Sequence, residues 1–150
     1  HRHLKSMREF HPWPRVEMTQ ETADKYGIQE GDWVLIENPR GSVREKCVIN
    51  PSMHPDTIMA EHGWWYPEQE ASEPSLFGTF DSNPNNCTRA FETGEGGIGS
   101  AIKSMLCKIY PVQEGDVLPH DVIAEKGDFA AYEPGKPYQV VEEPVVTVIN

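Results

Sequence analysis

The sequence predicts a mainly β domain with one or two short helices and long loops. Thirteen prolines and twelve glycines among 150 residues favour frequent turns, and hence short strands rather than long helices. Several segments alternate apolar and polar residues with the period of two that a half-buried strand requires. The length is that of one ordinary domain, and the hydrophobic (37%) and charged (25%) fractions are those of a globular chain.

The first regular elements are a helix and a strand. Thr19 is a typical helix N-cap, and Gly27 suits the left-handed conformation that follows a helix, so a short helix is predicted between them. Residues 33–37, with the sequence Trp-Val-Leu-Ile-Glu, predict a strand. The next four residues predict a tight turn in which Pro39 fixes φ and Gly41 tolerates a positive φ.

Three further strands are predicted after this turn. Residues 42–49 alternate apolar and charged side chains, and only Glu45 interrupts the inward row, so one face of the strand is expected to be solvated. Residues 57–61 predict the next strand, and regular structure returns at residues 103–110, where Lys103 is expected to stand just before a strand. Between residues 62 and 99 no helical or strand period is found. A loop of this length in a compact domain is usually functional or disordered, and its aromatic residues favour function.

The charge distribution excludes some functions. A net charge of −11 argues against a protein that wraps a nucleic-acid duplex, because phosphate contacts need a basic face. No apolar run approaches the ~18–20 residues of a membrane span, so membrane insertion is not expected. Residues 1–16 are basic and could meet an anionic ligand, whereas residues 113–150 are acidic and resemble a solvated extension. The alternative for each is a charged surface without a partner.

The search for catalytic motifs is negative. The chain has no nucleophile elbow, zinc-protease helix, phosphate-binding loop or dinucleotide glycine fingerprint. The glycines of residues 94–99 predict a flexible loop, and the histidines match no metal-ligand spacing. The three cysteines form no CxxC pair and are expected to be buried small hydrophobes. No catalytic residue and no metal ligand is therefore assigned.

Three groups of residues would suit a large polar, anionic and aromatic ligand. Residues 61–67 place stacking rings beside a glycine that permits close approach of the backbone. Residues 82–88 gather amides and hydroxyls that can bond the edge of a heterocycle, and Lys103 adds a cation. The alternatives are core packing for the tryptophan pair and ordinary turn chemistry for the asparagines. Taken one at a time, each group fits its alternative better.

Taken in order, these groups resemble the C-terminal dinucleotide-binding domain of the molybdopterin oxidoreductases, the superfamily of dimethyl-sulfoxide reductase and formate dehydrogenase. The resemblance covers residues 1–112. Its specific part is His-Gly-Trp-Trp at residues 62–65, followed by Ser-Asn-x-Asn-x-x-Thr at residues 82–88. Residues 23–34 and the Pro-Arg-Gly turn add weaker support. Two features depart from the family pattern: a Gly-Arg segment before the first residues is lacking, and Cys87 stands where many members have Leu.

The resemblance implies a six-stranded double-psi β-barrel that binds a bis-molybdopterin guanine dinucleotide carrying molybdenum or tungsten. The residues that it places at the cofactor are His1, Arg2, His62, Gly63, Trp64, Trp65, Asn83, Asn85, Thr88 and Lys103. In the family, the metal-ligating side chain and an iron–sulfur cluster belong to earlier domains, so this chain alone is expected to be inactive. The implied partners are the remaining domains of the parent chain and an iron–sulfur electron-transfer subunit.

The expected organisation is an N-terminally truncated barrel over residues 1–112, followed by an acidic C-terminal extension over residues 113–150. The alternative function is a stand-alone double-psi barrel that binds a ligand or a protein without redox chemistry, since fold does not fix function. The sequence leaves open the substrate, the choice between molybdenum and tungsten, the cellular side and the oligomeric state.

Overall fold

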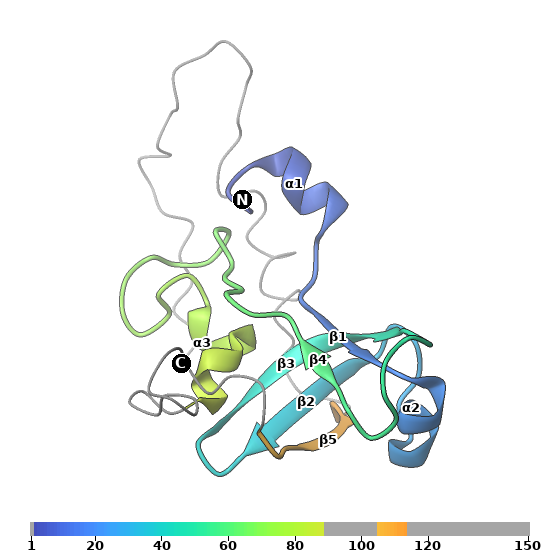
Figure 1. The fold of residues 1–150 in the computed structure, drawn as a ribbon. Helices are drawn as coiled ribbons and strands as arrows, with labels where there is room; N and C mark the ends of the chain where they lie inside the picture. The colour runs from blue at the N-terminus through green and yellow to red at the C-terminus, as the bar shows by residue number, and fades with distance from the viewer. Residues whose placement is uncertain (1, 89–104, 114–150) are drawn as a thin grey trace, which may run out of the picture. The chain divides into compact units, whose positions relative to one another are not determined.

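The computed structural model describes residues 2–88 and 105–113, which are mainly β with few helices (Figure 1). The elements, in chain order, are α1 (Lys5–Phe10), β1 (Arg15–Met18), α2 (Gln20–Tyr26), β2 (Trp33–Asn38), β3 (Gly41–Ile49), β4 (Met59–Ala60), α3 (Thr79–Ser82), the 3-10 turn η1 (Pro84–Cys87) and β5 (Lys108–Pro111). They belong to two compact units. The helical unit holds residues 2–13 and 65–81, and the sheet unit holds residues 14–64, 82–88 and 105–113.

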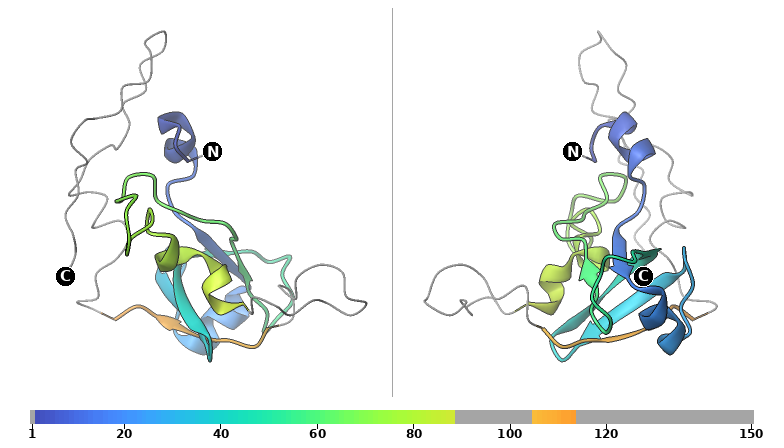
Figure 2. Two further views of the ribbon diagram at one scale, coloured as in Figure 1. Left: turned by 90° about the vertical axis from the view of Figure 1, so that its left-hand side faces the viewer. Right: turned by 45° about the vertical axis from the view of Figure 1, so that its right-hand side comes forward.

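The sheet unit is built on one five-stranded mixed sheet with the strand order β4-β1-β3-β2-β5. Strands β1 and β3 are parallel, and the other three pairs are antiparallel. Both views in Figure 2 show β5, in orange, at one edge of the sheet. A mainly β fold is therefore confirmed.

One face of the sheet carries the core. Strands alternate between faces, so every second side chain of β1, β2 and β3 points to the same side. That side packs with residues from α2, η1 and β5 into one buried cluster, which contains Val16, Met18, Ala23, Ile28, Val34, Ile36, Val43, Cys47, Cys87 and Ile109. Glu45 lies in the same inward row and is fully buried. The row of inward-facing side chains along β3, which Glu45 was expected to interrupt, is therefore buried without a break.

Helix α2 forms as the sequence predicts. The Thr19 hydroxyl accepts a hydrogen bond from the amide of Thr22 at 3.1 Å, which satisfies one of the free amides of the first turn. Gly27 ends the helix with φ of 69°, in the left-handed region that favours glycine. The amide of Ile28 then bonds back to the carbonyl of Ala23 at 2.9 Å and brings Ile28 into the core. The cap and the apolar contact together fix how the chain leaves the helix.

The predicted strands are present with shifted ends. The expected strands at residues 33–37 and 42–49 form the β2–β3 hairpin, while β4 and β5 are shorter than predicted. Helix α1 and strand β1 were not predicted: α1 has no side-chain cap, and β1 has only four residues. The irregular segment also contains α3 and η1 within its described part, which corrects the expectation of no helix there.

The cysteines follow the prediction in two cases out of three. Cys47 and Cys87 are buried in the core, but Cys107, which directly precedes β5, is exposed. Burial, with some repulsion from Glu30 and Asp32, raises the pKa of the Cys47 thiol to about 11. Cys47 is therefore an inert packing residue at neutral pH.

The helical unit consists of α1 and a compact loop of residues 65–81. The amide of Tyr66 bonds to the carbonyl of Phe77 at 2.7 Å and closes the base of the loop. Gly78 has φ of 61°, and a Cβ there would lie 2.4 Å from the side-chain oxygen of Gln69. Tyr66 is fully buried within this unit. None of the helices in the described part of the chain is long and apolar enough to cross a membrane.

Candidate functional site

Residues 82–88 form a turn that its own polar side chains shape. The Asn83 side-chain oxygen accepts the amide of Asn85 at 3.1 Å and caps η1, and Pro84 occupies the first position, where its missing donor costs nothing. The Thr88 hydroxyl donates to the carbonyl of Asn85 at 2.9 Å. The asparagines thus carry the turn chemistry that the sequence allowed as one alternative.

This turn is fixed to the β2–β3 hairpin at three points. The Ser82 hydroxyl donates to the carbonyl of Arg44 at 2.6 Å, and the Asn38 amide donates to the carbonyl of Cys87 at 2.7 Å. At the third point a Cβ on Gly41 would lie 2.6 Å from the carbonyl oxygen of Asn86. Gly41 is therefore required for close approach of the turn, and the expected positive φ is not found.

The fixed turn leaves amide groups available. Asn85 is exposed, and Asn83 and Thr88 are half-buried. Among the described residues, no hydrogen bond uses the side-chain amide of Asn85 or the Nδ2 donors of Asn83. A carboxamide presents both a donor pair and an acceptor, which is the pattern needed to bond the edge of a heterocycle. The turn can therefore be both a structural cap and a binding edge.

The second predicted segment begins where β4 ends. The amide of Glu61 donates to the side-chain Oε2 of Glu45 at 2.9 Å, which ties the start of this loop to β3. Gly63 has φ of 72°, and a Cβ on it would meet no atom within 4 Å, so open space adjoins the backbone there. His62 is exposed, but Trp64 is 5% exposed. Trp64 is thus buried, whereas His62 beside it faces outward.

Glu45 has an unusual environment for a carboxyl group. Burial raises its pKa to about 9, although the hydrogen bond from the Glu61 amide opposes that rise. The carboxyl group is therefore protonated at neutral pH, which removes the cost of an unpaired buried charge. Its Oε1 is buried and has no hydrogen-bond partner in the part of the chain that the structure describes.

Glu45→Gln is expected to abolish a pH dependence of stability. Between the ordinary pKa of 4.5 and the folded value of about 9, the unfolded chain loses a proton that the folded chain keeps. The free energy of unfolding then falls as pH rises, by up to about 1.4 kcal/mol per pH unit. Urea unfolding at several pH values should show a flatter profile for Glu45→Gln, with its greatest advantage near pH 9. Glu21→Gln, which removes an exposed carboxylate, should keep the wild-type slope; equal slopes for both variants would contradict the assignment.

The two segments are attached to consecutive residues of one strand. The carbonyl of Arg44 holds the turn of residues 82–88, and the side chain of Glu45 holds the loop that begins at Glu61. Strand β3 therefore brings the anchors of both predicted segments to neighbouring positions. Their sequence separation of some twenty residues gives no hint of this arrangement.

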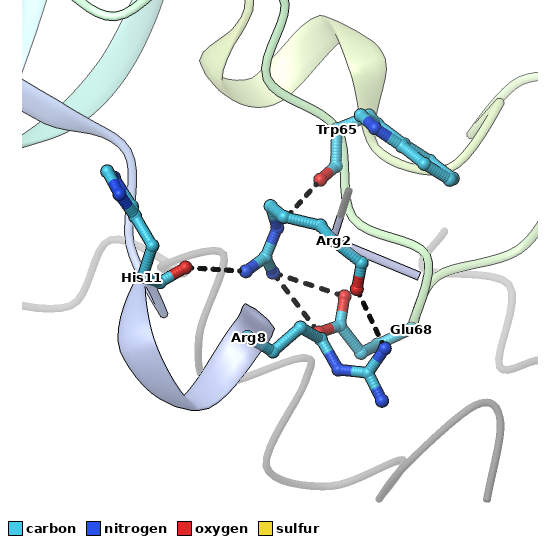
Figure 3. Close-up of polar contacts among 5 residues, drawn as sticks. All are labelled: Arg2, Arg8, His11, Trp65 and Glu68. Carbon is cyan, nitrogen blue, oxygen red and sulfur yellow. Dashed lines mark hydrogen bonds and ion pairs between the residues drawn. The ribbon is translucent and has the colours of Figure 1, made fainter. Parts of the chain in front are cut away.

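Arg2 and Trp65 are brought together in the helical unit (Figure 3). The Arg2 guanidinium donates to the carbonyls of Trp65, at 3.2 Å, and His11, at 3.0 Å, and to Glu68 at 3.1 Å. Arg8 forms an ion pair with the same carboxylate at 3.1 Å and donates to the carbonyl of Arg2 at 2.8 Å. All three charged side chains are buried. We call Arg2, Arg8 and Glu68 the arginine network.

The arginine network ties the two segments of the helical unit together. Trp65 is half-buried, and its ring meets Phe77 edge-on with centroids 5.4 Å apart. The Arg2 guanidinium also lies 5.7 Å from the centre of the Tyr66 ring, within cation–π range. Arg2 thus has a structural function in addition to the ligand contact predicted for it. Arg8 and Glu68 were not among the predicted site residues, since nothing local marks a pair 60 residues apart.

Two of the predicted ligand-contacting residues, His1 and Lys103, lie outside the described residues. Within residues 2–88 and 105–113, no group of three or more His, Cys, Asp or Glu side chains could hold a metal ion. The described site is therefore one of amides, hydroxyls, rings and arginines.

A buried polar atom suggests what such a site would accept. The Nε of Arg44 is buried and makes no hydrogen bond within the part of the chain described here. A guanidinium cannot lose its proton, so it fits an anionic ligand. The Arg44 side chain leaves β3 on the face opposite to Val43 and Glu45, so this donor is separate from the free amides of the turn, which fit the edge of a heterocycle.

Comparisons with known proteins agree with this chemistry. The model of a family described as "Molydopterin dinucleotide binding domain" matches residues 1–105. Dopamine dehydroxylase from Eggerthella lenta is 48% identical over 68 residues, which are 45% of this chain and 7% of that protein. A protein of Halobacterium salinarum, named as a putative catalytic component of dimethyl sulfoxide reductase, is 30% identical over 59 residues, which are 39% of this chain and 7% of that protein.

A solved structure resembles the fold as well. Acetylene hydratase from Pelobacter acetylenicus superposes with a TM-score of 0.51 at 27% identity, over 53% of this chain and 11% of that chain. The matched stretches are thus less than an eighth of each of these proteins.

Proposed function

Since this chain belongs to the molybdopterin dinucleotide-binding domain family, we propose that it clamps a bis-molybdopterin guanine dinucleotide as one domain of a larger molybdenum or tungsten oxidoreductase. The family match over residues 1–105 supports the ligand, and the small share of each relative that is matched supports the larger enzyme. The relatives named as a dehydroxylase and a reductase favour this over a binding module without redox chemistry.

The observation that carries the proposal is the anchored turn of residues 82–88. Two hydrogen bonds with the β2–β3 hairpin hold it and its backbone closely approaches Gly41, while the side-chain amide of Asn85 and the Nδ2 donors of Asn83 have no partner among the described residues. A rigid backbone with free amides binds a heterocycle at low entropic cost, because nothing has to be ordered on binding. Asn83, Asn85 and Thr88 are therefore the residues proposed to hold the pterin or guanine edge.

The other predicted residues are assigned supporting roles. His62 and Gly63 would approach the cofactor from the loop that Glu45 holds, and Trp64 would brace that loop from the core. Trp65 and Arg2 would act from the helical unit, with Arg2 fixing the Trp65 backbone. His1 and Lys103 are proposed as cofactor contacts on the family resemblance alone.

The chain contributes binding rather than bond-making. When bound, the cofactor supplies the metal and its redox chemistry, while these residues orient it and exclude water from its edge. We propose that residues 1–112 form the cofactor-binding domain as a six-stranded double-psi barrel, to which the observed mixed sheet contributes five strands. The acidic residues 113–150 would contact the other domains or an iron–sulfur partner protein, and the isolated chain would be inactive.

Asn85→Ala tests the proposed role of the turn. The intact protein that carries this chain should be purified from cells and analysed for molybdenum, tungsten and the guanosine monophosphate released by acid hydrolysis. Loss of the amide bonds should weaken retention of the dinucleotide roughly threefold to tenfold, the value of about one hydrogen bond. Gln29→Ala, which removes an exposed amide outside both segments, should retain the wild-type content. Wild-type protein without dinucleotide or metal would refute the proposed function, and full retention by Asn85→Ala would refute this residue's role.

A further inference from the structure

Cys87 is fixed at the closed end of the β2–β3 hairpin. Its carbonyl accepts the side-chain amide of Asn38 at 2.7 Å, and its thiol donates to the carbonyl of Gly41 at 3.5 Å. Asn38 and Gly41 are paired with each other where the two strands of the hairpin meet the turn. Since Cys87 also belongs to the buried cluster, it lies on the core face of the sheet at the end of β2.

The register of β5 brings Cys107 to the same end of β2. The two strands are antiparallel, and Glu37 of β2 pairs with Lys108 of β5. One position further along each chain, Cys107 comes opposite Asn38. Ile109 packs in the core, so the alternation of side chains directs Cys107, two positions before it, to the same face. Cys107 is therefore expected on the side of the sheet that η1 covers.

The electrostatics of the thiols agrees with this placement. Burial raises the pKa of the Cys87 thiol, and the negative charge that Cys107 acquires on ionisation raises it further. One charge acts on another in this way only at short range, because water and salt screen it over longer distances. For Cys47, by contrast, the charges that raise the pKa belong to Glu30 and Asp32. Two of the three cysteines thus lie near each other.

We propose that Cys87 and Cys107 are a redox pair that a small-molecule disulfide converts into an intramolecular disulfide. The thiolate of Cys107, which is exposed, attacks one sulfur of the oxidant and displaces a thiolate, leaving a mixed disulfide. The thiolate of Cys87 then attacks the sulfur of Cys107 and displaces the second thiolate. Two protein thiols are oxidised to one disulfide, and the oxidant is reduced to two thiols, which take up the two protons that the cysteines lose.

The bridge would attach the turn of residues 82–88 to a third strand, in addition to its two hydrogen bonds with the hairpin. Cys107 lies just outside the β5 ladder, so its backbone can adjust to the about 4.4–6.8 Å between Cα atoms that a disulfide requires. Burial raises the pKa of both thiols, so neither is activated, and the exchange should take hours rather than seconds. The pair would therefore respond to sustained oxidising conditions.

The experiment incubates the intact protein that carries this chain with excess oxidised glutathione under argon and maps its cysteines by mass spectrometry without reduction. Trypsin and a glutamate-specific protease place Cys47, Cys87 and Cys107 in three separate peptides. A peptide that links Cys87 to Cys107 should become the major form of both residues, and dithiothreitol should reverse it. Cys47 is buried, with a pKa of about 11, and should remain a thiol as the internal control.

Two variants separate the steps. In Cys87→Ser, Cys107 should stop at the mixed disulfide with glutathione, whereas in Cys107→Ser the buried Cys87 should remain a thiol. If Cys87→Ser fails to fold, the wild type and Cys107→Ser, which alters an exposed residue, decide. Wild-type protein in which Cys87 stays a thiol, or in which Cys107 links to another cysteine, would overturn the proposal. The readout is covalent chemistry and does not depend on the bound dinucleotide, so the proposed function can fail without affecting this result.

Discussion

Glu68→Gln is expected to destabilise the helical unit by about 3–5 kcal/mol, the cost of breaking a buried ion pair by removing one partner. The carboxylate of Glu68 is the shared acceptor of Arg2 and Arg8, with distances of 3.1 Å to each, and its side chain is 4% exposed. Glutamine keeps the shape but removes the charge, so two buried guanidinium groups would remain without their counter-ion. Few single substitutions in this chain should have a larger effect.

The measurement is amide hydrogen exchange of peptides from residues 2–13 and 65–81 in the intact protein, since exchange reports the local free energy of opening. Protection of both segments should fall together, because the arginine network joins them. Asp56→Asn removes the acid of the exposed Lys25–Asp56 pair and should change protection little. In a double-mutant cycle, Arg8→Gln should cost less in the Glu68→Gln background than alone. Protection within about 0.5 kcal/mol of wild type would exclude a stabilising network.

Gly41→Ala is expected to impair both stability and ligand binding. The added methyl group would lie 2.6 Å from the carbonyl oxygen of Asn86, which is backbone and cannot swing away. The turn of residues 82–88 must shift, which weakens the bonds of Ser82 and Asn38 that hold it. Overpacking of this kind typically costs about 1–3 kcal/mol. A displaced turn should also retain the dinucleotide several-fold more weakly.

Gly27→Ala is the matched control for this substitution. Gly27 has φ of 69° with no atom within 4 Å of an added Cβ, so alanine is strained there without meeting a neighbour. It should lower stability by about 1 kcal/mol, like other glycines at helix ends, and leave dinucleotide retention unchanged. Urea unfolding and the released guanosine monophosphate measure the two effects separately. Equal retention by the two alanine variants would show that the position of the turn does not matter for binding.

The parts of the fold that sequence alone predicted are those encoded locally. The Thr19 cap, the Gly27 stop and the hairpin of β2 and β3 each depend on residues a few positions apart, and all three are observed. Strand β1 was not predicted because its four residues are too few to show a clear alternation of apolar and polar side chains. Its position is set by pairing with β3. Helix α1 likewise lacks a capping side chain. Its Arg8 is fixed by a partner 60 residues away.

The candidate site was predictable as a set of residue types but not as a geometry. Residues 82–88 suggested amides for a heterocycle, and the structure adds that Ser82 and Cys87 hold the turn to the hairpin. Glu45 was expected to interrupt the inward row because a carboxylate is costly to bury, and its burial is compatible with the core because the raised pKa keeps the group protonated. A glycine at position 41 was expected because of a positive φ, whereas the structure requires it because the Asn86 carbonyl, 45 residues along the chain, leaves no room for a Cβ. Such contacts between distant segments cannot be inferred from spacing.

The attachment of two loops to consecutive residues of β3 has a consequence for how this domain can diverge. Sliding β3 by one position against β2 would exchange the faces of Arg44 and Glu45, putting a guanidinium in the core and a carboxyl group outside. The turn of residues 82–88 and the loop that begins at Glu61 would then both lose their anchors on β3. Insertions and deletions should therefore accumulate within these loops and not within this strand. For the same reason, loops from a relative should be exchangeable on this hairpin, provided that the register between β2 and β3 is preserved.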